Sequence, residues 1–139
     1  PDRILMAFHG LPREYLDKGD PYHCQCQKTA RLVRERLGLP TERLQIVFQS
    51  RFGKAEWLKP YAQDTVEALP GQGVKNLVII SPGFAADCVE TLEELGIGLK
   101  ETFIEHGGTN FTVVPCLNDQ PSSIAMLESL VRRELSGWL

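Results

Sequence analysis

The sequence predicts an α/β fold of three layers, in which helices cover both faces of a four-stranded parallel sheet, as in Rossmann-like domains. Short apolar runs alternate four times with longer segments of helical periodicity. Turn residues follow every apolar run, and 139 residues are enough for one domain with a single buried core. No internal repeat or linker interrupts the pattern, so residues 1–139 are expected to form one unit.

The expected elements follow in order along the chain. The strands are the apolar runs at residues 4–8, 44–48, 77–80 and 111–114, which are rich in β-branched and aromatic side chains. The helices are expected at residues 24–37, 60–69, 86–106 and 121–135, each bounded by proline or glycine. Gly96 and Gly98 lie inside the third helix, where each costs about 1 kcal/mol relative to alanine, so we expect an irregular or widened turn there.

Composition and charge exclude several classes of protein. The net charge is −3, with 15 basic and 18 acidic residues, so a nucleic-acid-binding surface is not expected. No apolar run approaches the length of a membrane span and the first residues do not form a signal peptide, which favours a cytoplasmic location. The chain starts with Pro1 and enters a strand almost at once, which predicts a segment of a longer polypeptide.

The four cysteines are expected to be reduced thiols. Cys24 and Cys26 are separated by one residue, which is closer than the usual C-x2-C pair of a zinc site. Known catalytic motifs are absent as well: no G-x-G-x-x-G or P-loop follows a strand, and no G-x-S-x-G elbow is present. Dinucleotide oxidoreductases, P-loop NTPases and serine hydrolases are therefore disfavoured.

Polar and reactive residues follow the strands at their carboxyl ends, where open α/β sheets bind ligands. These ends carry His9-Gly10, Ser50-Arg51, Pro82-Gly83-Phe84 and Cys116-Leu117-Asn118. The connections at the opposite edge look like plain turns. Ser50 and Arg51 are candidates for binding an anion, and Trp57 is either a core residue or a wall for a flat hydrophobic ligand. This edge of the sheet is the expected functional side.

An acidic segment follows the third strand and opens the third helix. In an α-helix, its carboxylates fall within a stripe of roughly 60°, formed by Asp87, Glu90, Glu94 and Glu101. The opposite face is then the expected core stripe, formed by Cys88, Leu92, Leu95, Leu99 and Phe103. The acids either make an ordinary solvated face, favoured by the helix dipole, or handle metal ions and protons. Their spacing alone leaves both interpretations open.

Taken together, the strand-end motifs resemble the bacterial ferrochelatases. FHGLP, GDPY, FQSRFG followed by WLKPY, PGFAADCVETLEE and PCLND occur here in the order found in that family. The resemblance runs almost end to end but covers only the C-terminal half of the family's length. It implies a Rossmann-like chelatase domain whose N-terminal partner domain is missing, and the insertion of Fe²⁺ into protoporphyrin IX, the last step of haem synthesis.

The resemblance also implies roles for particular residues. The family's invariant histidine falls on His9, and its catalytic glutamate falls on Glu90. Further acids of a metal or proton route fall on Asp87 and Glu94. The porphyrin-binding positions are Trp57, Phe84 and Ser50. The metal set implied in this way is His9, Glu90, Asp87 and Glu94, with Fe²⁺ as a substrate and no tightly bound cofactor.

The chain departs from the family pattern at two positions. Some members continue the acidic line to the position of Gly98, and some carry a second histidine at the position of Cys88. No C-terminal extension with cluster cysteines is present, so no iron–sulfur cluster is expected. For the 139 residues alone we expect little or no chelatase activity, because half of the cleft is absent.

Three alternatives stay open from the sequence: a chelatase for coproporphyrin, a chelatase for cobalt, or a non-catalytic module that binds a divalent metal or porphyrin. The sequence also leaves open which of His9 and Glu90 accepts a proton, the side from which the metal enters, the oligomeric state and a peripheral contact with a membrane.

Overall fold

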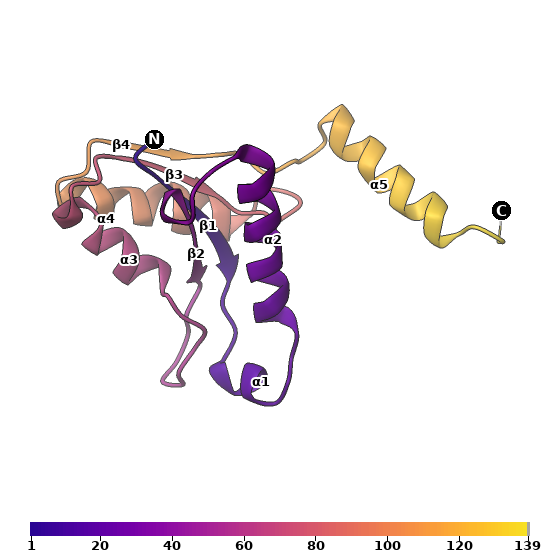
Figure 1. Cartoon of the computed structure of the whole chain (residues 1–139), viewed down its shortest axis with the longest axis horizontal. Coiled ribbons are helices and arrows are strands. Elements are labelled where there is room, and N and C mark those ends of the chain that lie inside the picture. The colour runs from indigo at the N-terminus through magenta and orange to yellow at the C-terminus, as the bar shows by residue number, and fades with distance from the viewer. Residues whose placement is uncertain (139) are drawn as a thin grey trace.

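Four parallel strands form one sheet in the computed structural model, which describes residues 1–138 (Figure 1). The strands are β1 (Arg3–His9), β2 (Leu44–Gln49), β3 (Asn76–Ile80) and β4 (Asn110–Val113), in the spatial order β2-β1-β3-β4. Every strand pair is parallel, and each strand lies within one residue of its expected bounds. The prediction of a four-stranded parallel sheet is confirmed.

Helices cover both faces of the sheet, so the three-layer prediction is also confirmed. One face is covered by α2 (Tyr22–Leu37), and the other by α3 (Ala62–Ala68) and by a π-helix, η3 (Glu90–Leu99), that continues into α4 (Lys100–Glu105). Three short helices were not expected: α1 (Arg13–Asp17), η1 (Thr41–Arg43) and η2 (Pro70–Gln72). Each is shorter than the window over which helical periodicity can be recognised.

Alternate side chains of the strands divide the core in two. Leu5, Ala7 and Val47 pack against α3, η3 and α4 on one face. Met6, Phe8 and Phe48 pack against α2 on the other. Both faces of the central strand β1 are therefore buried, which explains its continuous apolar sequence.

The acidic helix differs from the expected α-helix because ten of its residues, Glu90–Leu99, have π geometry. The widened turn predicted from Gly96 and Gly98 is confirmed, since both glycines lie inside it. A π-helix closes i→i+5 hydrogen bonds, so its side chains do not follow the α-helical period. The buried positions are Thr91, Leu95, Leu99 and, in α4, Phe103.

The expected core stripe was therefore wrong at two positions. Leu92 is 61% exposed, although the α-helical period placed it in the core. Cys88 is half-buried and precedes the helical residues, so it does not enter the core either. Cys88 differs because the π-helix begins only at Glu90, and Leu92 differs because a turn of a π-helix contains more residues than a turn of an α-helix.

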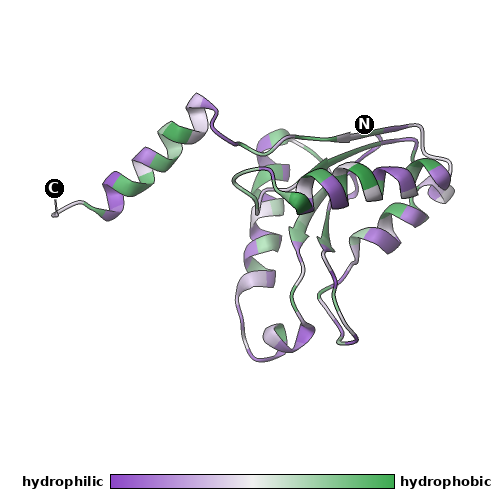
Figure 2. Cartoon of the chain, turned by 180° about the vertical axis from the view of Figure 1, so that it is seen from behind, coloured by the Kyte–Doolittle hydropathy of each residue, from purple (hydrophilic) through white to green (hydrophobic). Residues whose placement is uncertain are grey.

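The last helix, α5 (Pro121–Glu134), leaves the body of the domain after β4 and extends away from the sheet (Figure 1). Apolar and polar residues alternate along it without a partner element (Figure 2). Within α5, Ser123 is the one buried residue. Among residues 1–138, no helix has the length and hydropathy needed to span a membrane.

Candidate functional site

The candidate site lies at the carboxyl ends of the strands, where the chain changes direction across the sheet. After β1 the chain runs to β2 through α2 on one face, and after β3 it enters η3 on the other face. The ends of β1 and β3 are adjacent, and the two connections leave them toward opposite faces. Open α/β sheets bind their ligands at such a switch point. His9 lies at the end of β1, and the acidic segment follows β3.

His9 is held in one orientation with one nitrogen left open. Its Nδ1 lies 2.7 Å from the carbonyl oxygen of Gly10. A carbonyl only accepts, so Nδ1 carries the hydrogen, and Nε2 of the neutral ring is an unprotonated acceptor. The hydroxyl of Tyr22 donates to the carbonyl oxygen of His9 at 2.9 Å, and burial raises the pKa of Tyr22 to about 12, so this donor keeps its proton.

Gly10 allows an aromatic wall to approach the histidine closely. A Cβ at this position would lie 2.9 Å from the carbonyl oxygen of Gln49 and 2.9 Å from Cε3 of Trp57. The Trp57 ring lies beside His9, with 6.4 Å between ring centroids and an interplanar angle of 46°. Any larger residue at position 10 would displace backbone or the indole, so the glycine is required by packing.

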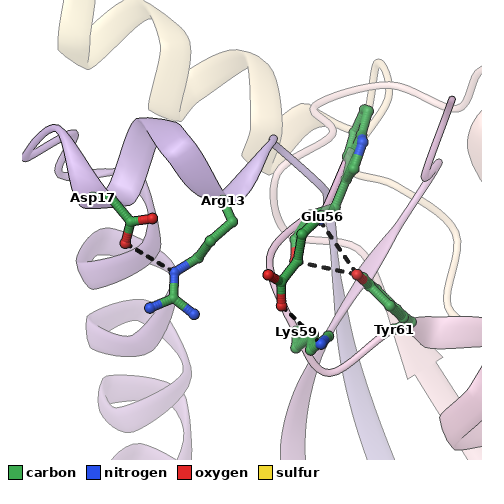
Figure 3. A network of polar contacts seen from close by, with 6 residues as sticks. Arg13, Asp17, Glu56, Lys59 and Tyr61 are labelled. Carbon is green, nitrogen blue, oxygen red and sulfur yellow. Dashed lines mark hydrogen bonds and ion pairs between the residues drawn. The ribbon is translucent and has the colours of Figure 1, made fainter. Parts of the chain in front are cut away.

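The loop that carries Trp57 is braced on both sides. Tyr61 places its hydroxyl 3.3 Å from the backbone nitrogen of Trp57 and 3.4 Å from its carbonyl oxygen. Figure 3 shows Tyr61 together with Glu56 and Lys59 of the same segment. Lys59 pairs with Glu56 at 2.8 Å in the same loop, and the backbone nitrogen of Arg13 donates to the carbonyl oxygen of Glu56 at 2.8 Å. These contacts hold the loop against the start of α1. Among residues 1–138, no acceptor pairs with the buried indole Nε1 of Trp57.

Glu90 is the first residue of η3 and is half-buried. A hydrogen bond from the thiol of Cys88 lowers the pKa of Glu90, with smaller contributions from its own backbone N–H and from the charge of His9. Glu90 is therefore an ionised carboxylate at neutral pH, close enough to His9 for their charges to interact. Together with Ser50, Val89, Glu93 and Glu94 it lines an open cavity of about 270 Å³.

Glu94 lies one turn further along η3 and is tied to the end of β2. Its Oε1 accepts a hydrogen bond from the backbone nitrogen of Ser50 at 2.6 Å, and its Oε2 accepts from the Ser50 hydroxyl at 2.6 Å. The side-chain amide of Gln49 donates to Oε2 at 3.1 Å. Ser50 has φ 63°, in the left-handed region that non-glycine residues rarely adopt, and Glu94 holds it there.

Asp87 is tied to the loop after β4. Its Oδ2 accepts from the Asn118 side chain at 2.7 Å, and its Oδ1 accepts from the Thr91 hydroxyl at 3.0 Å and from the backbone nitrogen of Cys116 at 3.2 Å. These bonds, led by the one from Asn118, lower the pKa of Asp87. The carboxylate is an anchor between two loops as well as a member of the acidic segment.

Phe84 is half-buried in the loop between β3 and η3. It lines an apolar cavity of about 430 Å³ together with the ends of β3 and β4 and one residue of α5, Met126. The structure thus places Phe84 on the α5 side of the sheet edge, whereas Trp57 stands over His9.

Sequence reasoning assembled most of the site but missed several of its members. Tyr22, Gln49 and Asn118 hold the reactive side chains, yet they were not selected as site residues. Tyr22, Gln49 and Asn118 all lie inside motifs that carry the family resemblance, which was a usable signal. Nothing in the local sequence marks Gln49 as the partner of Glu94, because the two residues come from different elements. Among residues 1–138, no three histidine, cysteine or acidic side chains are grouped tightly enough to hold a metal ion.

Comparisons with known proteins match this chain to one family. The family model described as Ferrochelatase matches residues 1–135. A ferrochelatase of Rhizobium meliloti (strain 1021) is 57% identical over all 139 residues, and one of Brucella ovis is 52% identical over the same length. The match covers 41% and 40% of these two relatives, so the chain spans about two fifths of their length.

A solved structure shares the fold. The putative cobalamin biosynthesis CbiX protein from Marinobacter aquaeolei VT8 superposes with a TM-score of 0.61 and covers 98% of both chains. Its sequence identity is 20%, so this likeness supports the Rossmann-like architecture and nothing further.

Proposed function

Because the chain belongs to the ferrochelatase family, we propose that it is the C-terminal half of a two-domain enzyme that inserts Fe²⁺ into protoporphyrin IX to form protohaem, the terminal step of haem synthesis. The observation that carries the proposal is the open Nε2 of His9 at the switch point of the sheet, beside the ionised Glu90. An unprotonated imidazole and a carboxylate are the groups that metal insertion into a porphyrin requires.

The reaction removes two protons from pyrrole nitrogens while Fe²⁺ loses its bound water. In the proposed mechanism Nε2 of His9 accepts one pyrrole proton, because the Gly10 carbonyl keeps the other ring nitrogen protonated. The second pyrrole proton passes to solvent water in the open cavity that Glu90, Glu93 and Glu94 line. Glu90 stabilises the imidazolium that forms and draws the metal toward the porphyrin. Its lowered pKa keeps Glu90 charged at neutral pH.

Imidazole nitrogen and carboxylate oxygen bind divalent iron without the high affinity of a thiolate site, which suits delivery rather than storage. His9 and Glu90 are the proposed ligands. Asp87 and Glu94 stay predicted members of the metal or proton route, and the hydrogen bonds from Asn118 and Ser50 already occupy oxygens of these two carboxylates.

Trp57, Phe84 and Ser50 are the proposed porphyrin-binding residues. The indole of Trp57 provides a flat apolar surface beside His9. Ser50 lies at the end of β2 with its hydroxyl directed at Glu94. The other wall of the cleft belongs to the N-terminal domain in this proposal, and the enzyme acts in the cytoplasm.

The experiment is a metal-insertion assay of the full-length protein with Fe²⁺ and protoporphyrin IX under reducing conditions, followed by porphyrin absorbance. We expect turnover in the wild type and its loss in His9→Ala. His106→Ala is the matched control, because His106 is exposed at the end of α4 and pairs with Glu67.

Parallel assays with coproporphyrin and with Co²⁺ identify the preferred substrates. Binding of porphyrin, seen as quenching of tryptophan fluorescence, without metal insertion by the wild type contradicts the enzyme and supports a binding module.

A further inference from the structure

Four hydrogen bonds tie Asp87 to Thr91 and to the loop after β4. We propose that Asp87 and Asn118 form a lock that positions Glu90, and that Asp87 acts through this geometry rather than as a metal ligand or proton carrier. The inference rests on the proposed function, since it assigns a positioning role in the same reaction. The residues of the lock come from the loops that follow β3 and β4.

The lock is reciprocal. The Asn118 amide donates to Oδ2 of Asp87 at 2.7 Å, while the backbone nitrogen of Asp87 donates to Oδ1 of Asn118 at 2.8 Å. The backbone nitrogen of Asn118 also donates to the carbonyl oxygen of Ala85 at 2.9 Å. Asn118 has φ 49°, a left-handed conformation that asparagine tolerates better than most residues. Three bonds and a demanding backbone angle therefore converge on one asparagine.

The lock reaches Glu90 from both directions along the chain. Asp87 precedes Glu90 by three residues, and its Oδ1 accepts from the hydroxyl of Thr91, the next residue after Glu90, at 3.0 Å. Thr91 is 2% exposed, and its hydroxyl also accepts from the backbone nitrogen of Cys88 at 3.0 Å. Because Cys88 before Glu90 and Thr91 after it are both held, the backbone of Glu90 and the start of the π-helix have little freedom.

The same contacts argue against coordination by Asp87. A carboxylate has about four acceptor positions, and three of them already receive hydrogen bonds from Asn118, Thr91 and Cys116. A metal ion would have to displace at least one of these donors. Displacing Asn118 or Thr91 would release the segment that carries Glu90. A metal ion bound at Asp87 would therefore disturb Glu90, the residue to which the metal is to be passed.

Exchanging the side chains of Asp87 and Asn118 distinguishes a positioning role of Asp87 from a role as a metal ligand. In the double variant Asp87→Asn with Asn118→Asp, the amide at position 87 can still accept from Thr91 and Cys116 and can donate to the carboxylate at position 118. Every hydrogen bond of the lock is kept, but the charge moves to the other loop. The single Asn118→Asp variant places two carboxylates against each other, and the single Asp87→Asn variant places two amide donors against each other.

We expect each single variant of the full-length enzyme to lose about tenfold to a hundredfold in kcat for iron insertion, with the KM for porphyrin unchanged, because Glu90 is misplaced. The double variant should recover to within a few-fold of the wild type. A double variant as slow as Asp87→Asn would overturn the proposal, since a ligand or proton carrier needs its charge at position 87.

A second variant keeps the test decisive if the exchanged pair does not fold. Asn118→Gly retains the left-handed backbone, removes the side chain and leaves the carboxylate of Asp87 intact. The lock predicts the same loss of kcat as in the single variants, whereas a ligand role predicts activity close to the wild type.

Thermal unfolding of each variant identifies a merely structural role, in which the melting temperature falls while kcat of the folded enzyme is unchanged. That result also overturns the proposal. Absence of turnover in the wild type would instead contradict the proposed function, so the two failures are distinguishable.

A second inference rests on a different part of the molecule, the apolar face of α5. Its exposed apolar residues are Ile124, Met126, Leu127, Leu130, Val131 and, just after the helix, Leu135. At about 100° per residue they fall on one half of the helix, which also holds Glu134 of its last turn, and Glu128, Ser129, Arg132 and Arg133 fall on the other half. A helix of this length is marginally stable in water without packing against an apolar partner. Figure 2 shows this face without a neighbouring element.

We infer that α5 packs against the part of the full-length protein that lies outside this chain. The relatives have more than half of their length outside the matched region, which is enough for a further domain. At its start α5 buries Ser123 and places Met126 beside the ends of β3 and β4, and the helix extends outward from this point of attachment. Packed in this way, α5 would contact both halves of the enzyme and hold them together around the cleft.

Hydrogen exchange of the full-length protein tests this inference, with Leu127→Asp compared to Ser129→Asp on the polar half of α5. We expect α5 amides to be protected in a monomer, and Leu127→Asp to speed their exchange at least about tenfold while Ser129→Asp leaves it unchanged. Unprotected amides in the wild-type monomer overturn the inference. Light scattering measures whether the protein dimerises. If the α5 amides are protected only in a dimer, the apolar face binds a second copy of the protein, and the inference is overturned as well.

Discussion

Glu94 and Ser50 lie on different elements, yet both carboxylate oxygens of Glu94 accept a hydrogen bond from Ser50, each at 2.6 Å. One donor is the backbone nitrogen and the other is the hydroxyl, so the pair fixes both the position and the rotamer of Ser50. The contact joins the π-helix to the end of β2. It also satisfies a backbone donor in a segment whose φ of 63° takes it out of the strand.

Removing the Glu94 carboxylate should therefore destabilise the domain. We expect Glu94→Ala to lower the free energy of unfolding by about 1–3 kcal/mol, because the Ser50 nitrogen loses its acceptor. Glu94→Gln should cost less, since its amide oxygen can still accept from Ser50 and its NH₂ group can donate to Oε1 of Gln49, which has no donor among residues 1–138. Urea denaturation measures both, with Glu93→Ala as the exposed control on the same helix. Equal losses for Glu94→Ala and Glu93→Ala would contradict the role of the contact.

The π geometry of η3 predicts opposite outcomes for two leucines that an α-helix would place on one face. Leu95 is fully buried and Leu92 is 61% exposed. Leu95→Ala should cost about 2–5 kcal/mol of unfolding free energy through the cavity that it leaves. Leu92→Ala should change stability by less than about 0.5 kcal/mol. Similar costs for both would indicate an α-helix in solution.

The predictable part of the fold was the sheet. Its strands are short apolar runs bounded by turn residues. Because β1 is buried on both faces, its sequence does not alternate, and its short length identifies it as a strand. The direction of Leu92 and Cys88 could not be obtained from a helical period, because hydrogen bonding in η3 changes the number of residues per turn. The two glycines indicated where the irregularity lies but not that it extends over ten residues.

The candidate site was also predictable only in part. Position at a strand end sufficed to select His9, Ser50 and the acidic segment. The hydrogen bonds of Asp87 to Asn118 and of Glu94 to Gln49 span 31 and 45 residues of sequence, and pairings of such separation are decided by the tertiary fold. The tautomer of His9 likewise depends on a local backbone contact that no spacing rule reports.

Gly10 should be intolerant of the smallest side chain. The methyl group of Gly10→Ala would lie 2.9 Å from the carbonyl oxygen of Gln49 and from the Trp57 ring, so we expect a loss of about 1–3 kcal/mol in stability and a shift in tryptophan fluorescence. Gly71→Ala is the matched control, because among residues 1–138 no atom beyond the adjoining backbone lies within 4 Å of its added methyl group. Unchanged fluorescence and stability in Gly10→Ala would show that Trp57 does not pack there.

Asp2 should make stability depend on acid pH. Its carboxylate accepts hydrogen bonds from the backbone nitrogens of Lys75 and Asn76 and from the Asn76 side chain, and these bonds, led by that of Lys75, lower its pKa. A group with a lowered folded-state pKa stabilises the protein above its unfolded pKa of about 3.9 and loses that contribution as the pH falls through the folded value.

Wild type should therefore exceed Asp2→Asn in stability by a constant amount at neutral pH, and the difference should shrink below about pH 4. Urea denaturation between pH 7 and the acid limit of folding measures it. A difference that grows on acidification has the wrong sign and would contradict the assignment.

The most direct test of the account compares iron insertion by Glu90→Gln and Glu93→Gln in the full-length protein. Both residues lie on the first turn of η3 and line the same open cavity, but only Glu90 is linked to Cys88 and His9. The account predicts that Glu90→Gln lowers kcat at least about a hundredfold, while Glu93→Gln stays within a few-fold of the wild type. Equal rates for the two variants would contradict it, because the acidic segment would then contribute only general negative charge.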